Sequence, residues 1–105
     1  MDLHRLCLVT IVAETVLGDQ ITRSLLELGA TGYTVTESRG RGSRGIRTGD
    51  IPGTGLRIEA VVGTEVARAI LKMVQERYFA DYAVIAWTTE VDVVRGDKYL
   101  GASED

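Results

Sequence analysis

The sequence predicts an α+β domain in which a four-stranded antiparallel sheet has two helices on one face. Three observations lead to this fold class. Short β-rich apolar segments and two amphipathic segments of helical period follow one another in the order β-α-β-β-α-β. The chain has 105 residues, 45% of them hydrophobic, which suffices for one compact core but not for two domains. A long glycine-rich stretch divides the pattern into two halves.

The first half has the pattern of strand, helix and strand. The apolar, β-branched run from about Arg5 to Ala13 is typical of a central strand. Apolar residues then recur at helical spacing, with Thr15 as the expected N-cap and Gly29 just past the expected end. Residues 32–38 alternate in polarity, which predicts a second strand. The apolar helical positions are Leu17, Ile21, Leu25 and Leu28.

The second half repeats this order. Residues 56–62 alternate between apolar and charged side chains and predict the third strand. Thr64 is the expected N-cap of a second amphipathic helix. Residues 82–89 predict a fourth strand, which continues to Val94 or is followed there by a short extra strand. The expected apolar face of the second helix consists of Val66, Ala69, Ile70, Met73 and Val74.

Two β-α-β units in this order form the ferredoxin-like arrangement. One face of its sheet has no helices, and we expect Tyr33, Val35 and Trp87 to make that face an apolar patch. Exposed apolar patches usually mark association surfaces. The sequence therefore predicts a homotrimer whose sheets pack around a threefold axis.

The loop between the halves is the best candidate for a binding site. It runs from Arg39 to Thr54 and holds five of the twelve glycines and the only proline. Its first part, Arg39–Arg47, includes four arginines, and taking their +4 from the net charge of −3 leaves −7 for the rest of the chain. Glycines let backbone amides surround an anion, and guanidinium groups match phosphate oxygens. This pattern favours a small phosphate-bearing ligand over a long nucleic acid.

Two other interpretations of the loop stay open. It can be a solvated hairpin loop whose arginines balance an acidic surface. It can also be an Arg-Gly-Gly arm that binds nucleic acid, although such arms act with interleaved aromatic residues, which this loop lacks. A P-loop is not supported, because no Gly-Lys-Ser or Gly-Lys-Thr triplet occurs and the loop leads into a strand.

Other classes of site have little support in the sequence. The single Cys7 lies in an apolar run, so we expect a buried, unreactive thiol and no intramolecular disulfide. With one His and one Cys, we expect neither a transition-metal site nor a Cys/His nucleophile. No stretch is long and apolar enough to cross a bilayer, and no signal-peptide pattern is present, which predicts a soluble, cytoplasmic protein.

Several segments resemble the PII-like signalling proteins, in particular the SbtB branch and its carboxysome-associated relatives. The resemblance rests on Gly32–Val35 and Gly40–Arg47, with Val9-Thr10, Gly29–Tyr33 and Arg77–Tyr82 in support. It implies one domain over residues 1–105. It implies a homotrimer with three intersubunit clefts, each binding an adenine nucleotide (AMP, ADP, ATP or cyclic AMP) beside a mobile T-loop, here residues 39–55. It implies no bound cofactor. The implied partner is a membrane transporter, often one for bicarbonate, and binding to it would place the protein at the periphery of the membrane.

The resemblance also assigns residues to the cleft. The start of the second strand would line it, the loop would hold the phosphates, and the backbone of the fourth strand in a neighbouring subunit would meet the base. Bicarbonate is a candidate second ligand. The implied nucleotide-binding residues are Gly32, Tyr33, Thr34, Gly40, Gly42, Ser43, Arg44, Arg47, Ala83, Val84, Ile85 and Ala86.

The sequence departs from the family pattern in places that bear on function. Val84 stands where the family commonly has Gly, which reshapes the pocket for the base. The loop has no Tyr for the uridylylation of classical PII proteins, and no Gly-Lys-rich turn follows the second helix. We therefore do not predict glutamine or nitrogen signalling.

The leading hypothesis is a non-enzymatic nucleotide sensor that regulates inorganic-carbon transport or metabolism. One alternative is a nucleotide-hydrolysing enzyme of the same fold, for which the acid/base candidates Glu37, Asp50 and Glu59 have no partner at diagnostic spacing. Another is a CutA-like metal-binding trimer, which shares the fold but requires ligands that this chain has in small number.

Overall fold

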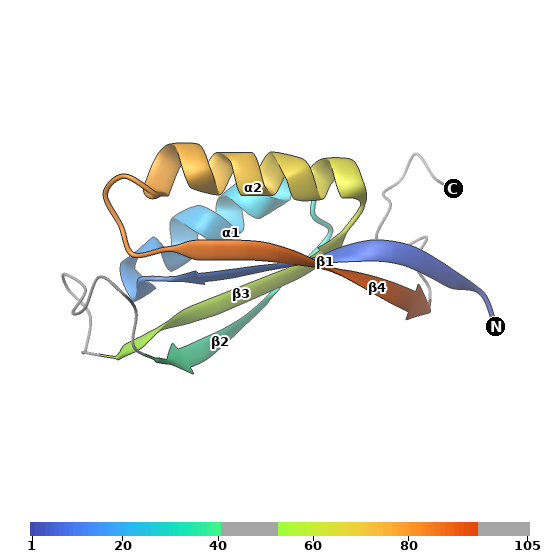
Figure 1. Ribbon diagram of the computed structural model, residues 1–105, viewed down its shortest axis with the longest axis horizontal. Coiled ribbons are helices and arrows are strands. Elements are labelled where there is room, and N and C mark those ends of the chain that lie inside the picture. The colour runs from blue at the N-terminus through green and yellow to red at the C-terminus, as the bar shows by residue number, and fades with distance from the viewer. Residues whose placement is uncertain (41–52, 95–105) are drawn as a thin grey trace.

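The computed structural model describes residues 1–40 and 53–94 and has the predicted α+β architecture. Both helices lie on the same side of one sheet (Figure 1). The first half consists of β1 (Leu3–Ala13), the short 3-10 turn η1 (Thr15–Leu17), α1 (Gly18–Glu27) and β2 (Thr34–Arg39). The second half consists of β3 (Thr54–Val62), α2 (Thr64–Tyr78) and β4 (Ile85–Val94).

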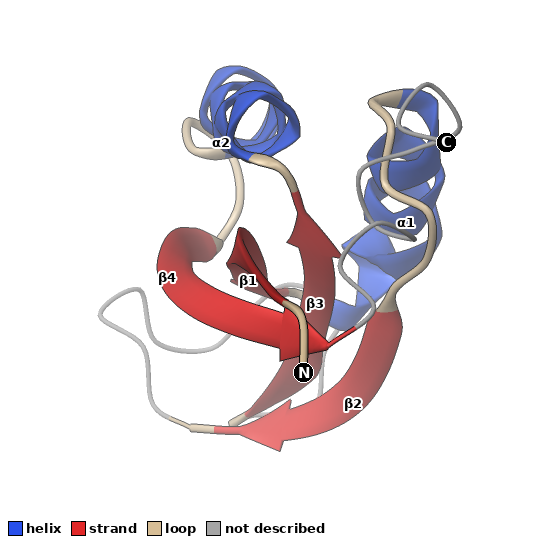
Figure 2. Cartoon of the chain, turned by 90° about the vertical axis from the view of Figure 1, so that its right-hand side faces the viewer, coloured by secondary structure: helices blue, strands red, loops and turns tan. Residues whose placement is uncertain are grey.

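The sheet has four antiparallel strands in the order β2-β3-β1-β4. The apolar β1 is central, as predicted, and pairs with β3 from Cys7 to Ala13 and with β4 from Leu3 to Val12. Consequently β2 and β4 form the two edges of the sheet. Figure 2 shows α2 over the β4 side of the sheet and α1 over the β2 side.

Alternate residues of β1 and β3 form the floor of the core under the helices. Val9, Ile11 and Ala13 of β1 are at most 1% exposed, and their partners in β3 are buried, except for the half-buried Leu56 opposite Ala13. Burial of each large aliphatic side chain contributes about 1.5–3 kcal/mol. Leu28, Val66 and Ala69 are only half-buried, whereas Ala67 and Tyr78, which the sequence did not single out, belong to the core. The rest of the core consists of Leu17, Ile21, Leu25, Ala30, Ile58, Ala60, Val62, Ile70, Met73 and Val74.

The predicted end of the first helix is confirmed in detail. Gly29 has a φ of 116°, a conformation that glycine adopts at low cost. The N–H of Gly29 donates to the carbonyl of Leu26, and the N–H of Ala30 donates to the carbonyl of Leu25. This pair of bonds is the Schellman motif, which satisfies carbonyls at the end of α1.

Both expected N-caps are wrong. Leu17 is the cap residue of α1, Glu14 that of the preceding η1 and Gly63 that of α2, and none of them makes a side-chain capping hydrogen bond. Thr15 and Thr64 lie one position further on, as the first residues of η1 and α2. The reason is the length of the strands before them: β1 and β3 end so close to the helical segments that only one residue is left for each turn.

The strand boundaries also shift. β2 begins at Thr34 and β4 at Ile85, later than the alternation of polarity predicts. The amides of Asp81 and Tyr82 donate to the carbonyl of Tyr78, which holds both residues in the turn after α2 and outside the strand. At its other end β4 runs without interruption to Val94, so the continuous strand is the correct one of the two alternatives.

The open face of the sheet differs from the prediction at one residue. Val35 pairs with Ile58, which in turn pairs with Ile11, so all three side chains lie on the helix-covered face. Trp87 pairs with Thr10 and lies on the opposite, open face. The expectation that Val35 and Trp87 share the open face is therefore wrong, although both side chains are substantially exposed.

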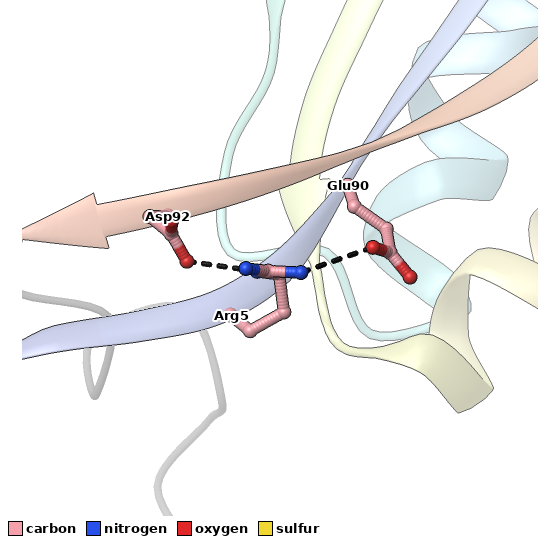
Figure 3. Close-up of polar contacts among 3 residues, drawn as sticks. All are labelled: Arg5, Glu90 and Asp92. Atoms are coloured by element: carbon pink, nitrogen blue, oxygen red, sulfur yellow. Dashed lines mark hydrogen bonds and ion pairs between the residues drawn. The ribbon is translucent and has the colours of Figure 1, made fainter.

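β1 and β4 extend beyond the end of β3 as a two-stranded ribbon. On this ribbon the guanidinium of Arg5 lies between two carboxylates (Figure 3). Its Nε is 2.8 Å from Asp92 Oδ1, and one terminal nitrogen is 3.0 Å from Glu90 Oε2. The hydrogen bond and charge of Asp92, and then the charge of Glu90, raise the pKa of Arg5 above its ordinary value. All three side chains are exposed, so the contribution to stability is small.

Candidate functional site

A pocket of about 330 Å³ lies beside the start of β2, on the open side of the sheet. The predicted site residues Gly32, Tyr33 and Thr34 form one wall of it. The strand register explains the other wall, since Thr34 pairs with Glu59 and Leu8 pairs with Val61. The described residues that line it are Leu8, Thr31, Gly32, Tyr33, Thr34, Glu59, Ala60 and Val61.

The pocket is suited to a flat, partly apolar group. Leu8 and Val61 are half-buried and provide an aliphatic surface, and Tyr33 is 45% exposed. A Cβ placed on Gly32 would meet no atom within 4 Å, so this glycine leaves open space in the wall. Sequence reasoning did not assign Leu8 to the site, because only the pairing of β1 with β3 brings it there.

Among the described residues that line this pocket, Glu59 is the one carboxylate, and its neighbours hold it in place. Thr10 Oγ1 donates a 2.9 Å hydrogen bond to Glu59 Oε2, and Arg57 Nη2 lies 3.5 Å from the same oxygen. The guanidinium of Arg57 is also 5.5 Å from the ring centroid of Trp87, within the range of a cation–π contact. Glu59 Oε1 has no hydrogen-bond partner among the described residues, so it can accept a bond from a hydroxyl or amino group in the pocket.

β2 connects this pocket with the arginine-rich segment. Its last residue, Arg39, pairs with Thr54, and the N–H of Gly40 donates a 2.7 Å bond to the carbonyl of Gly53. Gly53 has a φ of 82°, which suits a glycine in this turn. Gly40 thus lies at the stem of the predicted T-loop. The predicted phosphate-binding residues Gly42, Ser43, Arg44 and Arg47 lie outside the described residues.

The other group of predicted site residues lies at the start of β4. Ala83 and Val84 precede the strand, and Ile85 and Ala86 are its first residues. Val84 and Ala86 pack against the core, whereas Ile85 is 58% exposed on the open face, opposite Val12. The N–H of Ala83 donates a 2.8 Å hydrogen bond to the side chain of Glu14. Glu14 is a residue that sequence reasoning missed.

The two groups of residues lie at opposite edges of the sheet. Thr34 on β2 and Trp87 on β4 belong to one row across the four strands, through Glu59 and Thr10. Three strand spacings separate them by about 14 Å. One nucleobase cannot contact both edges of the same chain, so a cleft containing both groups requires a second copy of the chain.

Glu37 and Glu59, the two described carboxylates among those considered for acid/base chemistry, do not form a pair. Glu37 pairs with Leu56 and belongs to the helix-covered face, whereas Glu59 pairs with Thr34 and belongs to the open face. Asp50 lies outside the described residues. Glu37 and Glu59 therefore cannot act on one substrate within a single chain.

Three further expectations concern cysteine, metals and membranes. Cys7 is a free thiol that is half-buried against the core, and so less covered than predicted. Within residues 1–40 and 53–94, no group of three or more His, Cys, Asp or Glu side chains is placed to hold a metal ion. In the same part of the chain, the helices are too short or too polar to span a membrane.

Comparisons with known proteins agree with this architecture. A family model described as nitrogen regulatory protein P-II matches residues 6–98. A protein from Thermus thermophilus, described as a PII-like signalling protein, is 53% identical, with a TM-score of 0.83 over 95% of this chain and 100% of that chain.

CPII from Thiomonas intermedia is a more distant structural match. The structure of CPII bound to ADP and bicarbonate is 25% identical, with a TM-score of 0.80 over 93% of this chain and 97% of that chain. The structure bound to ADP, AMP and bicarbonate is 23% identical, with a TM-score of 0.82 over 95% of this chain and 98% of that chain.

Proposed function

The chain belongs to the P-II family, and we propose that within this family of signalling proteins it is a non-enzymatic sensor of adenine nucleotides. The observation on which the proposal mainly rests is the pocket at Gly32, Tyr33 and Thr34. This pocket combines an aliphatic surface with an acceptor, Glu59 Oε1, and β2 leads from it directly to Arg39–Arg47. CPII, which has the same fold, binds ADP together with bicarbonate.

The proposed binding unit is a homotrimer. The residues assigned to the nucleotide lie at opposite edges of the sheet, and the open face exposes Trp87 and Ile85. A threefold arrangement brings the β2 edge of one chain to the β4 edge of the next and covers the open face. Light scattering after gel filtration then gives three times the 11.4 kDa mass of one chain.

The T-loop, residues 39–55, is the proposed output of the sensor. The loop residues that would hold the phosphates are Gly40, Gly42, Ser43, Arg44 and Arg47. Their contacts with the phosphates would select one conformation of the loop over others. The proposed target is a membrane transporter for bicarbonate, as in the SbtB branch. Pull-down of the transporter from membranes, with and without nucleotide, tests this part.

Calorimetry with AMP, ADP, ATP and cyclic AMP tests the sensor itself. Each of Arg44→Ala and Arg47→Ala is expected to weaken binding by about 1.5–3 kcal/mol, because each removes a charge-assisted contact. Arg5→Ala is the matched control, since it removes the same charge from the exposed ribbon, away from both site edges. Failure of all four nucleotides to bind the purified protein would refute the proposal. Sustained nucleotide hydrolysis with Mg²⁺ would show an enzyme instead.

A further inference from the structure

Glu14 is a buried carboxylate that the proposed function does not yet use. It lies between β1 and η1 and is only 5% exposed. Its backbone carbonyl accepts the N–H of Leu17, but its side chain makes no capping bond to that turn. Oε2 instead accepts the N–H of Ala83, at 2.8 Å and 69 positions along the chain. A buried carboxylate is costly unless it is hydrogen-bonded, so this contact stabilises the side chain of Glu14 in its buried position.

The contact lies where the strand pairing stops. β1 and β4 pair as far as Val12 and Ile85, so Ala83 lies two residues before the first paired residue of β4. Beyond that point the side chain of Glu14, instead of a backbone carbonyl of β1, accepts the hydrogen bond from the N–H of Ala83. The neighbouring residues on the helix side are held separately, since the N–H of Tyr82 donates to the carbonyl of Tyr78. The segment between α2 and β4 is thus fixed at both ends.

We propose that Glu14 is a positioning residue for the β4 edge of the nucleotide cleft, an inference that rests on the proposed function. It fixes the backbone of Ala83 and Val84 so that this segment can meet the base bound to the neighbouring chain. One consequence refines the site: the N–H of Ala83 is occupied, so it is not a donor to the nucleotide. The backbone N–H donors open to the base from this edge therefore come from the residues after Ala83.

Three variants separate hydrogen bonding from charge and size. Glu14→Gln keeps an acceptor oxygen at the same reach and loses the charge. Glu14→Leu has a similar volume and no acceptor, and Glu14→Asp keeps the charge on a shorter side chain. Amide hydrogen exchange by NMR reports on Ala83 directly, and the Tyr82 amide, bonded to Tyr78, is the internal control. The amides of Ile11 and Ile58 in the paired strands report whether each variant is folded.

We expect Glu14→Gln to keep the protection of the Ala83 amide and an ADP affinity close to that of the natural chain. Glu14→Leu and Glu14→Asp are expected to lose that protection and to bind ADP about tenfold more weakly, because the Ala83 donor is left unsatisfied. Normal Ala83 protection or normal ADP affinity in folded Glu14→Leu or Glu14→Asp overturns the inference, as does loss of both in Glu14→Gln. If the natural chain binds none of the four nucleotides, the proposed function fails and with it the positioning role, while Ala83 exchange still decides whether Glu14 fixes this segment.

Discussion

Gly29 and Gly32 lie three residues apart in the segment between α1 and β2, and we predict opposite consequences for their replacement by alanine. At Gly29 the φ of 116° disfavours any side chain, and the new Cβ would lie 3.3 Å from Val66 Cγ2. A left-handed conformation costs a non-glycine residue about 1–2 kcal/mol. Gly32 has neither a positive φ nor a neighbour within 4 Å. Replacing glycine by alanine at a compatible position stabilises a protein by about 0.4–1 kcal/mol, because it reduces the conformational entropy of the unfolded chain.

Urea unfolding and nucleotide calorimetry on both variants test this contrast. Gly29→Ala is expected to lower the free energy of unfolding by about 1–2 kcal/mol, or the melting temperature by roughly 4–16 °C. Gly32→Ala is expected to leave stability unchanged or slightly raised, but to weaken ADP binding, because its methyl group enters the pocket. A Gly29→Ala variant as stable as the natural chain, or a Gly32→Ala variant that is clearly destabilised, would refute the reasoning.

Three further predictions concern the sheet. Thr10→Val is expected to cost about 1 kcal/mol in urea unfolding, because it removes the donor to Glu59 Oε2, and an unchanged midpoint would contradict that. Ile85→Asp is expected to shift the proposed trimer toward monomers in light scattering, and a trimer that persists in this variant would exclude Ile85 from the interface. Arg5→Gln is expected to lower stability slightly, and less so at high salt. Because folding raises the pKa of Arg5, the contribution of Arg5 to stability is complete below its ordinary pKa and is lost only in strong alkali. The difference in stability between the natural chain and Arg5→Gln should therefore stay constant from about pH 6 to 9.

The parts of the fold that the sequence predicted are those determined by local patterns. The helical spacing of Ile21 and Leu25 and the glycine after them are sufficient to locate α1 and its C-terminal end, whereas Leu17 belongs to the preceding turn η1. The apolar character of residues 5–13 correctly indicates a strand with neighbours on both sides. In these segments, local preference and tertiary packing favour the same structure.

The parts that could not be predicted depend on long-range register. The alternation of polarity around Val35 correctly indicates a strand, but only the pairing of Val35 with Ile58 shows to which face of the sheet its side chain belongs. Leu8 reaches the pocket through its pairing with Val61, and Glu14 meets Ala83 across 69 positions of sequence. A one-residue change of register would move every side chain of a strand to the other face, and the register depends on the partner strand and the connecting turn as well as on the pattern of the strand itself.

The geometry of β2 restricts how the proposed sensor can transmit its signal. β2 pairs with β3 along its whole length, from Thr34 at the pocket to Arg39 at the loop stem, a distance of about 17 Å. Bending the strand at the pocket would break this pairing, so a base bound there has little effect on the conformation of the loop through β2. The signal therefore depends on direct contact between the phosphates and the arginines of Arg39–Arg47. Adenosine and ADP should then compete for the same pocket, while only the nucleotide with phosphates changes the protease sensitivity of the loop; equal effects of both ligands would contradict this mechanism.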